Sequence, residues 1–270
     1  MRLRVCEKKM KTILKFACLP LLIAFASITH ADTIALNSAA GSASSDSNGA
    51  LEYLGFSPLN ASFVANKYSP LVAPAVLTAS NGTLSTSTTT YVTNPNGVWA
   101  NAITGTSWIT NTSVAGPNCS GSQCDPNGFY YYQTKFTAVG GVELYNGSIS
   151  VMADDTLEVV LNAGTANQLV LVNFAISGAD GHCATGTSTG ANATPSCGAV
   201  DTISLIGIPL LAGTNTLTII DAQTGLSGAG VDMSANLTQA PEPASLLMLG
   251  TGLLGLAFVL FRRNRALLRL

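Results

Sequence analysis

Short runs in which apolar and polar residues alternate follow one another through most of the chain. They lie at residues 86–93, 105–110, 128–137, 147–153, 156–162, 168–176, 201–208, 215–222 and 229–238. Within the fourth run, Ile149, Val151 and Ala153 alternate with polar or smaller residues, as in a strand with one buried face. No apolar stripe with a helical period occurs outside the two ends of the chain. Many short strands joined by long polar loops predict an all-β fold, a jelly-roll β-sandwich, over residues 51–238.

The N-terminal stretch has a different pattern, in which a basic segment is followed by an apolar one. The basic segment ends at Lys15, residues 16–26 are almost entirely apolar, and Thr29 and Ala31 place small side chains where a signal peptidase cuts. The apolar run is too short to span a bilayer comfortably. We therefore expect residues 1–31 to be a signal peptide with a helical apolar core.

Alternatives to this interpretation remain open at the sequence level. Translation from Met10 would leave a shorter signal of the same kind, and an uncleaved anchor or a lipoprotein attached through Cys18 would place the chain differently. The following residues, 32–50, are poor in large apolar side chains and rich in Ser, Ala and Gly. They predict a flexible leader before the folded domain.

The C-terminal end contains a second long apolar run. Residues 244–261 carry no charge, which is near the minimum length for a membrane-spanning helix. Arg262, Arg263 and Arg265 follow at once and would stay on the cytoplasmic side, so we expect a transmembrane helix with the preceding domain outside. The simplest interpretation of residues 239–270 is a plain tail anchor.

A short proline motif precedes this apolar run. Pro241, Glu242 and Pro243 keep the backbone extended, because proline has no N–H to donate within a helix and disfavours the helical conformation of the residue before it. The order of this motif, a Gly- and Leu-rich span and an arginine cluster resembles a PEP-CTERM sorting signal. The resemblance implies processing by an exosortase, an integral-membrane thiol transpeptidase that cuts near the Pro-Glu-Pro. It also implies a precursor anchored in the inner membrane of a Gram-negative bacterium, with the cell surface or an exopolysaccharide-containing matrix as destination.

The β-type region carries a second resemblance. Trp99, Trp108 and the segments 130–136, 153–162, 213–219 and 228–232 occur in an order similar to that of galactose-binding-like jelly-roll domains. The resemblance covers about residues 90–238 and departs from the pattern by a Cys-containing insertion at 177–199. It implies the fold but no ligand, because such domains bind sugars in some proteins and serve as scaffolds in others.

Charge is distributed unevenly along the chain. Between residues 32 and 240 there are two basic residues, Lys67 and Lys135, against twelve acidic ones, a formal charge of −10. A region without a basic patch is not expected to bind nucleic acid. It also lacks the arginine or P-loop lysine that phosphate chemistry uses.

Four cysteines remain once the signal peptide is removed. An even number in an exported protein predicts disulfides, and each pair lies within one polar loop: Cys119 with Cys124, and Cys183 with Cys197. Local pairing is favoured over the two crossed alternatives because closing a short loop costs less entropy. A zinc site is a further alternative, although the second pair is widely spaced for one.

Two acidic residues and one histidine are candidates for chemistry. Asp154 and Asp155 join two predicted strands, point to opposite faces and are most simply a turn, with calcium binding as the alternative. His182 lies in a loop, and the Gly-x-Ser-x-Gly motif of a serine hydrolase is absent. The residues Trp99, Trp108 and Tyr130 to Tyr132 fit core packing better than stacking on sugar rings.

We interpret the chain as an exported, non-enzymatic protein of the cell surface or matrix, structural or adhesive in a biofilm. Signal peptidase and an exosortase are its expected processing partners, exopolysaccharide is a possible contact, and no cofactor, metal or catalytic residue is predicted. The alternatives are a carbohydrate-binding module of the same fold and a hydrolase whose carboxylate pair the sequence does not reveal.

Overall fold

The computed structural model describes residues 32–38, 51–58, 72–117, 119–139, 143–174, 197–223, 228–240 and 243–267. The chain divides into two units, and the first of them is Asp32–Gln239. The second contains the C-terminal helix α3 (Pro243–Leu267). The predicted signal helix at 1–31 lies outside the described residues.

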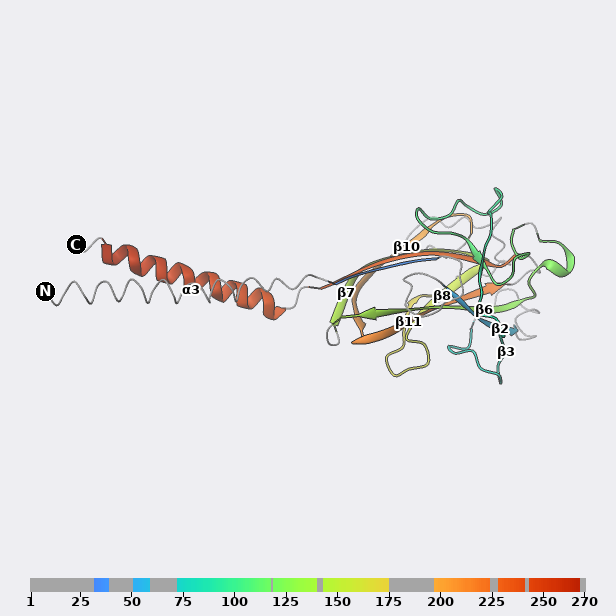
Figure 1. Ribbon diagram of the computed structural model, residues 1–270, viewed down its shortest axis with the longest axis horizontal. Coiled ribbons are helices and arrows are strands. Elements are labelled where there is room, and N and C mark those ends of the chain that lie inside the picture. Colours follow the sequence, from blue (N-terminus) through green and yellow to red (C-terminus); the bar gives the residue numbers. More distant parts are fainter. Residues whose placement is uncertain are drawn as a thin grey trace. The chain divides into compact units, whose positions relative to one another are not determined.

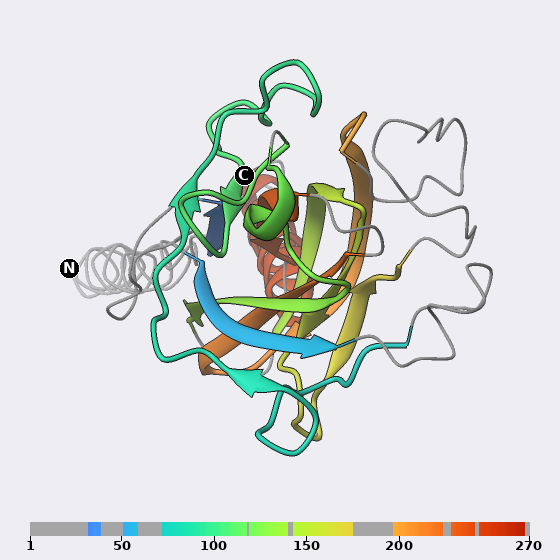
Figure 2. The same ribbon diagram turned by 90° about the vertical axis from the view of Figure 1, so that its right-hand side faces the viewer.

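Two six-stranded antiparallel sheets form the first unit (Figure 1). The first sheet has the order β10 (Asp201–Leu210), β7 (Glu143–Asp154), β12 (Gly230–Gln239), β5 (Ile109–Thr110) and β4 (Tyr91–Val92), and β1 (Thr33–Asn37) also pairs with β12. The second has the order β3 (Thr83–Leu84), β2 (Glu52–Pro58), β6 (Gly128–Ala138), β11 (Gly213–Gln223), β8 (Thr156–Leu161) and β9 (Leu169–Val172). Figure 2 shows the strands of both sheets around a shared interior. The all-β sandwich is therefore confirmed.

Alternate side chains of both sheets fill the space between them. Ile149 and Val151 of β7 and Met233 of β12 face Leu217 and Ile219 of β11, and all are buried in one hydrophobic cluster. This arrangement follows from the two-residue period of a strand, which sends every second side chain to the same face. Each fully buried aliphatic side chain contributes roughly 1.5–3 kcal/mol, so this cluster is the main source of stability.

The outer face of the second sheet is also covered in part. Phe129 and Tyr131 of β6 pack with Val160 of β8 and Ile220 of β11 in a separate cluster that includes Leu77. The Tyr131 hydroxyl donates to the carbonyl oxygen of Pro74 at 2.7 Å. Strands buried on both faces lose their simple alternation, which explains the continuous aromatic run at 129–132.

Strand β1 corrects the prediction of a flexible leader. All five of its residues pair with β12, from Thr33 opposite Thr238 to Asn37 opposite Ser234, and Ile34 and Leu36 are buried. The leader prediction over 32–50 is therefore wrong for residues 33–37, because two apolar side chains at alternate positions suffice to add a strand. Residues 39–50 lie outside the described residues.

Strand β10 is an edge strand of the first sheet. Its pairing with β7 is interrupted by a bulge between Leu205 and Ile208, and Gly207 within the bulge has a φ of 66°. The positive φ is the left-handed conformation that glycine adopts without strain.

Helix α3 contains the predicted helix 244–261 and continues past the arginine cluster. It begins at Pro243, whose missing N–H costs nothing in the first turn of a helix. The predicted helix is thus confirmed, but its predicted membrane-spanning character is not. Within the described part of the chain, no helix meets the length and apolarity needed to cross a membrane.

Candidate functional site

The proline motif lies where the sandwich ends and α3 begins. Strand β12 ends at Gln239 and Pro243 is the first residue of α3, while Pro241 and Glu242 lie outside the described residues. Near the other end of the helix, the guanidinium carbon of Arg262 lies 5.4 Å from the centre of the Phe258 ring. The predicted motif therefore occupies the connection between the folded unit and the helix.

The apolar side chains of α3 are exposed over much of the helix. Leu253, Leu254, Phe258 and Phe261 are among them, and Leu254 is 72% exposed. Together with the other exposed apolar residues of α3, these side chains point in several directions around the helix axis, so the apolar surface does not form one narrow stripe. An exposed apolar surface of this kind indicates a site of contact with a membrane or a protein partner.

The first unit is bounded by two residues that bind each other. The backbone N–H of Gln239 donates to the carbonyl oxygen of Asp32 at 2.8 Å, and the backbone N–H of Asp32 donates to Oε1 of Gln239 at 3.1 Å. The Asp32 carboxylate also accepts a hydrogen bond from the Tyr145 hydroxyl at 2.9 Å. These contacts join the first residue after the predicted signal-peptide cut to the last residue of the final strand.

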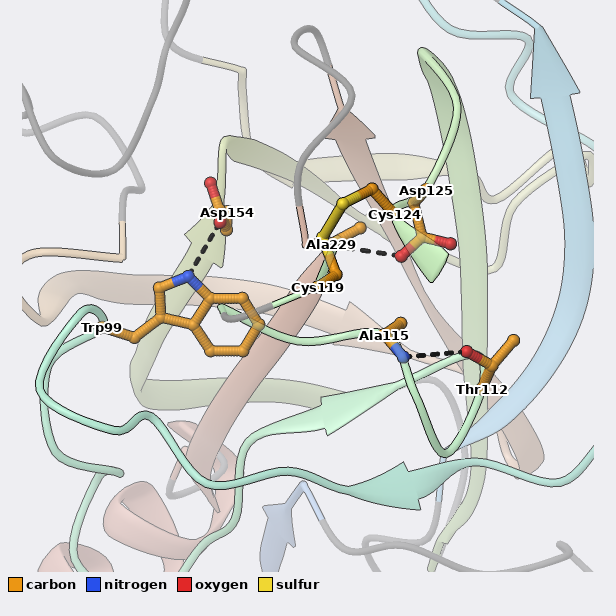
Figure 3. The surroundings of a disulfide bond; sticks show 8 residues. All are labelled: Trp99, Thr112, Ala115, Cys119, Cys124, Asp125, Asp154 and Ala229. Carbon is orange, nitrogen blue, oxygen red and sulfur yellow. Dashed lines mark hydrogen bonds between the residues drawn. A yellow bond between two sulfur atoms is a disulfide. The ribbon is translucent and has the colours of Figure 1, made fainter. Parts of the chain in front are cut away.

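Cys119 and Cys124 form a disulfide, with a Cα–Cα distance of 5.0 Å, around the short 3₁₀-helix η1 (Gly121–Gln123). The next residue, Asp125, accepts a hydrogen bond from the backbone N–H of Ala229 at 3.2 Å (Figure 3). It accepts a second one from Nδ2 of Asn111 at 2.9 Å. The disulfide loop is thereby fastened to the segment that leads into β12.

Cys197 is also disulfide-bonded and wholly buried. Its predicted partner, Cys183, lies outside the described residues, as does His182, so the pairing of Cys183 with Cys197 stays a prediction. The carbonyl oxygen of Cys197 accepts a hydrogen bond from the backbone N–H of Ala100 at 2.7 Å.

The two tryptophans belong to the interior. Trp99 and Trp108 are 3% and 1% exposed, and their ring centres lie 4.5 Å apart. Nε1 of Trp99 donates to Oδ2 of Asp154 at 2.7 Å (Figure 3), and Nε1 of Trp108 donates to the carbonyl oxygen of Ala100 at 2.9 Å. Tyr130, Tyr131 and Tyr132 are buried as well. These aromatic residues pack the interior and offer no exposed platform for sugar rings.

Asp154 and Asp155 lie at the junction of β7 and β8, and both are buried. The backbone N–H of Asp155 donates to the carbonyl oxygen of Ala222 on β11 at 3.2 Å. Burial is the unexpected property, because a turn of this composition is usually exposed. At Asp154 the burial is accompanied by a hydrogen bond from Nε1 of Trp99, which also packs over Gly230, the residue paired with Asp154 on β12.

Two further carboxyl groups, which the sequence did not single out, complete what we call the acid cluster: Asp125, Asp154, Asp155 and Asp221. Asp221 on β11 pairs with Tyr130 of β6 on one side and Leu157 of β8 on the other. It is 0% exposed, and neither of its carboxylate oxygens has a hydrogen-bond partner. The strand register brings these acids together. In the sequence, the only sign of the burial of Asp221 is its place on β11 two residues after Ile219, on the face that points into the core.

Burial determines how Asp221, Asp125 and Tyr132 titrate. It raises the pKa of Asp221 well above the usual range, and the negative charges of Asp154, Asp155 and Asp125 raise it further. Burial also raises the pKa of Asp125, although its hydrogen bonds from Asn111 and Ala229 oppose this. The pKa of the buried Tyr132 rises for the same reason, with Asp221 and Asp125 adding to the effect of burial.

The arrangement does not resemble a metal site. Across the described ranges, no three His, Cys, Asp or Glu side chains are grouped so that they could hold a metal ion. The calcium alternative for Asp154 and Asp155 would have to find its further ligands among backbone and amide oxygens.

The C-terminal segment matches a known family model. Residues 239–263 match the PEP-CTERM protein-sorting motif, so the resemblance noted in the sequence is confirmed. The motif implies an exported surface protein that an exosortase sorts from a membrane-anchored precursor. No curated protein matches the chain.

Two solved structures show a distant likeness to the chain. One is a GH26-CBM35 β-(1,4)-mannanase from Podospora anserina, with 18% identity and a TM-score of 0.29 over 57% of this chain and 26% of that one. The other is a cycloalternan-forming enzyme from Listeria monocytogenes in complex with a pentasaccharide substrate, with 16% identity and a TM-score of 0.21 over 43% of this chain and 10% of that one. The chain thus spans about a quarter and a tenth of these proteins, and neither likeness assigns it a ligand.

Proposed function

We propose that the protein is an exported, non-enzymatic component of the cell surface or extracellular matrix, structural or adhesive in a biofilm, which an exosortase releases from its membrane anchor. The observation that carries the proposal is the position of the sorting motif relative to the folded unit. All strands of the sandwich lie before residue 240, and the proline motif follows at once. A cut there would detach the helix without breaking a single strand pair.

The N-terminal boundary supports the same proposal. Asp32 is the first residue after the predicted signal-peptidase cut, and it is hydrogen-bonded to Gln239, the last residue of β12. After such a cut the Asp32 nitrogen becomes an ammonium group and remains a hydrogen-bond donor. Both processing steps would therefore leave the unit Asp32–Gln239 intact.

Helix α3 would hold the precursor at the membrane until the second cut. Its exposed apolar side chains, such as Leu253, Leu254 and Phe258, would be covered by lipid instead of water. Arg262, Arg263 and Arg265 would stay on the cytoplasmic side, because moving a guanidinium group through hydrocarbon is costly.

The experiment replaces Pro241, Glu242 and Pro243 together with alanine in a strain that makes an exosortase. We expect the variant to stay in the membrane fraction at full C-terminal length, because alanine lets α3 extend through the cleavage region. Fractionation and intact-mass measurement provide the readout. The unaltered protein in an exosortase-deletion strain is the matched control and should show the same retained mass. If the unaltered protein keeps its arginine tail in exosortase-producing cells, the proposal is wrong.

A carbohydrate-binding role of the same domain, a galactose-binding-like jelly roll, is a second candidate that one surface favours. The outer face of β10, β7, β12 and β1 carries rows of uncharged hydroxyl and amide side chains across the strands. They are Thr202, Ser204, Asn146, Ser148, Ser150, Ser234, Asn236, Thr238, Thr33 and Asn37, all exposed or half-buried. Such a face can exchange hydrogen bonds with a neutral polysaccharide without an unpaired charge.

Glutamate substitutions on this face test the second candidate. Ser148→Glu with Asn236→Glu places two adjacent carboxylates in the middle of the rows, because these residues are directly opposite each other on β7 and β12. Sedimentation with the purified exopolysaccharide of the producing strain should show binding by the unaltered protein and at least a tenfold loss in the variant, on the order of 1.4 kcal/mol. Thr137→Glu with Thr214→Glu, at paired positions on β6 and β11 of the other sheet, is the charge-matched control. Equal binding by all three proteins would exclude this face.

A further inference from the structure

Asp221 occupies a position where an apolar residue would be expected. On the same face of β11, Leu217 and Ile219 belong to the hydrophobic core between the sheets. Asp221 continues this series at the next step, with its side chain fully buried and both carboxylate oxygens without a hydrogen bond. An ionised carboxylate in such a place costs several kcal/mol unless its charge is neutralised.

The titratable groups of the described residues around Asp221 are acids and phenols. Asp154 and Asp155 approach it from the junction of β7 and β8, and Asp125 approaches it from the disulfide loop. The phenols of Tyr130 and Tyr132 come from β6.

Two further carboxyl groups on neighbouring elements are engaged elsewhere, and one further phenol lies near the cluster. Glu158 of β8 is in register with Ile220 and so lies on the other face of the sheet. Asp232 of β12 accepts hydrogen bonds from Ser38 Oγ at 2.7 Å and from the backbone N–H of Ile103 at 2.8 Å. Tyr53 of β2 is this phenol: burial raises its pKa, and the negative charge of Asp125 raises it further.

Among the described residues, no basic side chain lies beside Asp221 to neutralise this charge. The span 32–240 has no arginine and only two lysines. Lys135 is exposed on β6, and Lys67 lies outside the described residues. A metal ion is the second means of neutralisation, but no three carboxylate, imidazole or thiol groups of the described residues are grouped to hold one. A proton on a carboxyl group is the third.

We propose that Asp221 holds a proton in the folded domain, and that the acid cluster makes the sandwich a pH-sensitive element. The domain is most stable in acid, and alkaline solution weakens the packing of the two sheets by removing this proton. The consequence for a surface protein is that its folded state responds directly to the pH outside the cell.

The direction of the pH dependence follows from the proton balance. The pKa of Asp221 is higher in the folded state than the value of about 3.9 for an exposed aspartate. Between these two pKa values the folded state binds more protons than the unfolded state, so stability falls as the pH rises. One such group changes the ratio of folded to unfolded protein by at most about tenfold per pH unit.

The experiment measures unfolding of the full chain in detergent by urea, from about pH 5 to about pH 9. The chain has two tryptophans, Trp99 and Trp108, and both are buried in the sandwich, so their fluorescence reports its unfolding. We expect the midpoint of the unaltered protein to fall as the pH rises. The midpoint of Asp221→Asn should equal that of the unaltered protein at the acid end and exceed it at the alkaline end. The dependence of its unfolding free energy on pH should be smaller by the equivalent of about one proton. Equal slopes would overturn the proposal.

Two controls separate this effect from other causes. Asp232→Asn alters an equally buried carboxyl group that has hydrogen-bond donors, and it should lower the midpoint without any gain at the alkaline end. Calcium chloride added to the unaltered protein at the alkaline end should have no effect. A rise of the midpoint that Asp221→Asn abolishes would assign the cluster to a cation and overturn the proton assignment.

An infrared measurement on the unaltered protein decides the matter if Asp221→Asn fails to fold. A protonated carboxyl group has a carbonyl stretching band distinct from that of a carboxylate. The band of the protonated carboxyl group should be present at neutral pH. It should disappear over the alkaline range in which the urea midpoint falls. Its absence at neutral pH would contradict the proposal.

Discussion

At the scale of single residues, Trp99 connects three parts of the structure. Its ring packs against Trp108 and lies over Gly230, and its Nε1 donates to Asp154 at the end of β7. A Cβ atom at position 230 would lie 2.7 Å from the Trp99 ring, so only glycine fits beneath it. Trp99 thus covers the end of the sandwich where the acid cluster lies.

Trp99→Phe is expected to destabilise the domain by about 1–3 kcal/mol, because the change removes a donor from a buried carboxylate. Trp108→Phe is the matched control: its Nε1 donates to the uncharged carbonyl oxygen of Ala100, and we expect a smaller loss. Urea unfolding followed by circular dichroism measures both. A loss for Trp108→Phe that equals or exceeds the loss for Trp99→Phe would contradict this account of the Asp154 contact.

At the scale of elements, β1 shows how a short strand can depend on two side chains. Leu36→Ala should cost about 2–5 kcal/mol, because Leu36 is 1% exposed in the core and its truncation leaves a cavity. Ala35→Ser, on the exposed face of the same strand, should change stability by no more than about 0.5 kcal/mol. Urea unfolding of both variants tests the assignment. If both leave stability unchanged, β1 does not contribute to the sandwich.

The predicted runs overlap β4 to β12, whereas β1, β2 and β3 lie outside them. Strands β6 to β12 correspond to the predicted runs, because those buried on one face, such as β10, alternate and those buried on both faces, such as β6, are rich in aromatic residues. Strand β2 was missed because a bulge between Tyr53 and Gly55 breaks its alternation. Gly55 has a φ of 136°, and a Cβ atom there would lie 2.2 Å from the Thr83 carbonyl oxygen, so the chain needs glycine at this step.

The two candidate sites differ in how far the sequence could reveal them. The sorting motif is continuous, so Pro241 to Arg265 could be recognised without a structure. The acid cluster depends on register: Asp221 meets Tyr130 and Leu157 only because β11 pairs with β6 and β8 at that step. Because side chains alternate along a strand, the sequence alone places Asp221 on the same face as Leu217 and Ile219. It does not show which other carboxyl groups lie beside Asp221.

At the scale of the whole molecule, the first and last residues of the folded unit lie side by side. Asp32 and Gln239 are hydrogen-bonded, and the sorting motif follows within two residues. The span 32–240 carries a formal charge of −10, while the basic residues are concentrated in the two terminal segments. Removal of both segments would leave a strongly acidic domain, which favours solubility and mutual repulsion between copies.

The place of β12 in its sheet also has a mechanical consequence. A surface protein attached through its C-terminal end would receive any pull from flowing liquid at Gln239, the last residue of β12. This strand is paired with β7 over its whole length and with β1 over five residues on its other side. Load along the axis would shear both ladders at once instead of opening them one hydrogen bond at a time. As long as helix α3 anchors the precursor, its attachment point therefore lies on a strand that is paired on both sides.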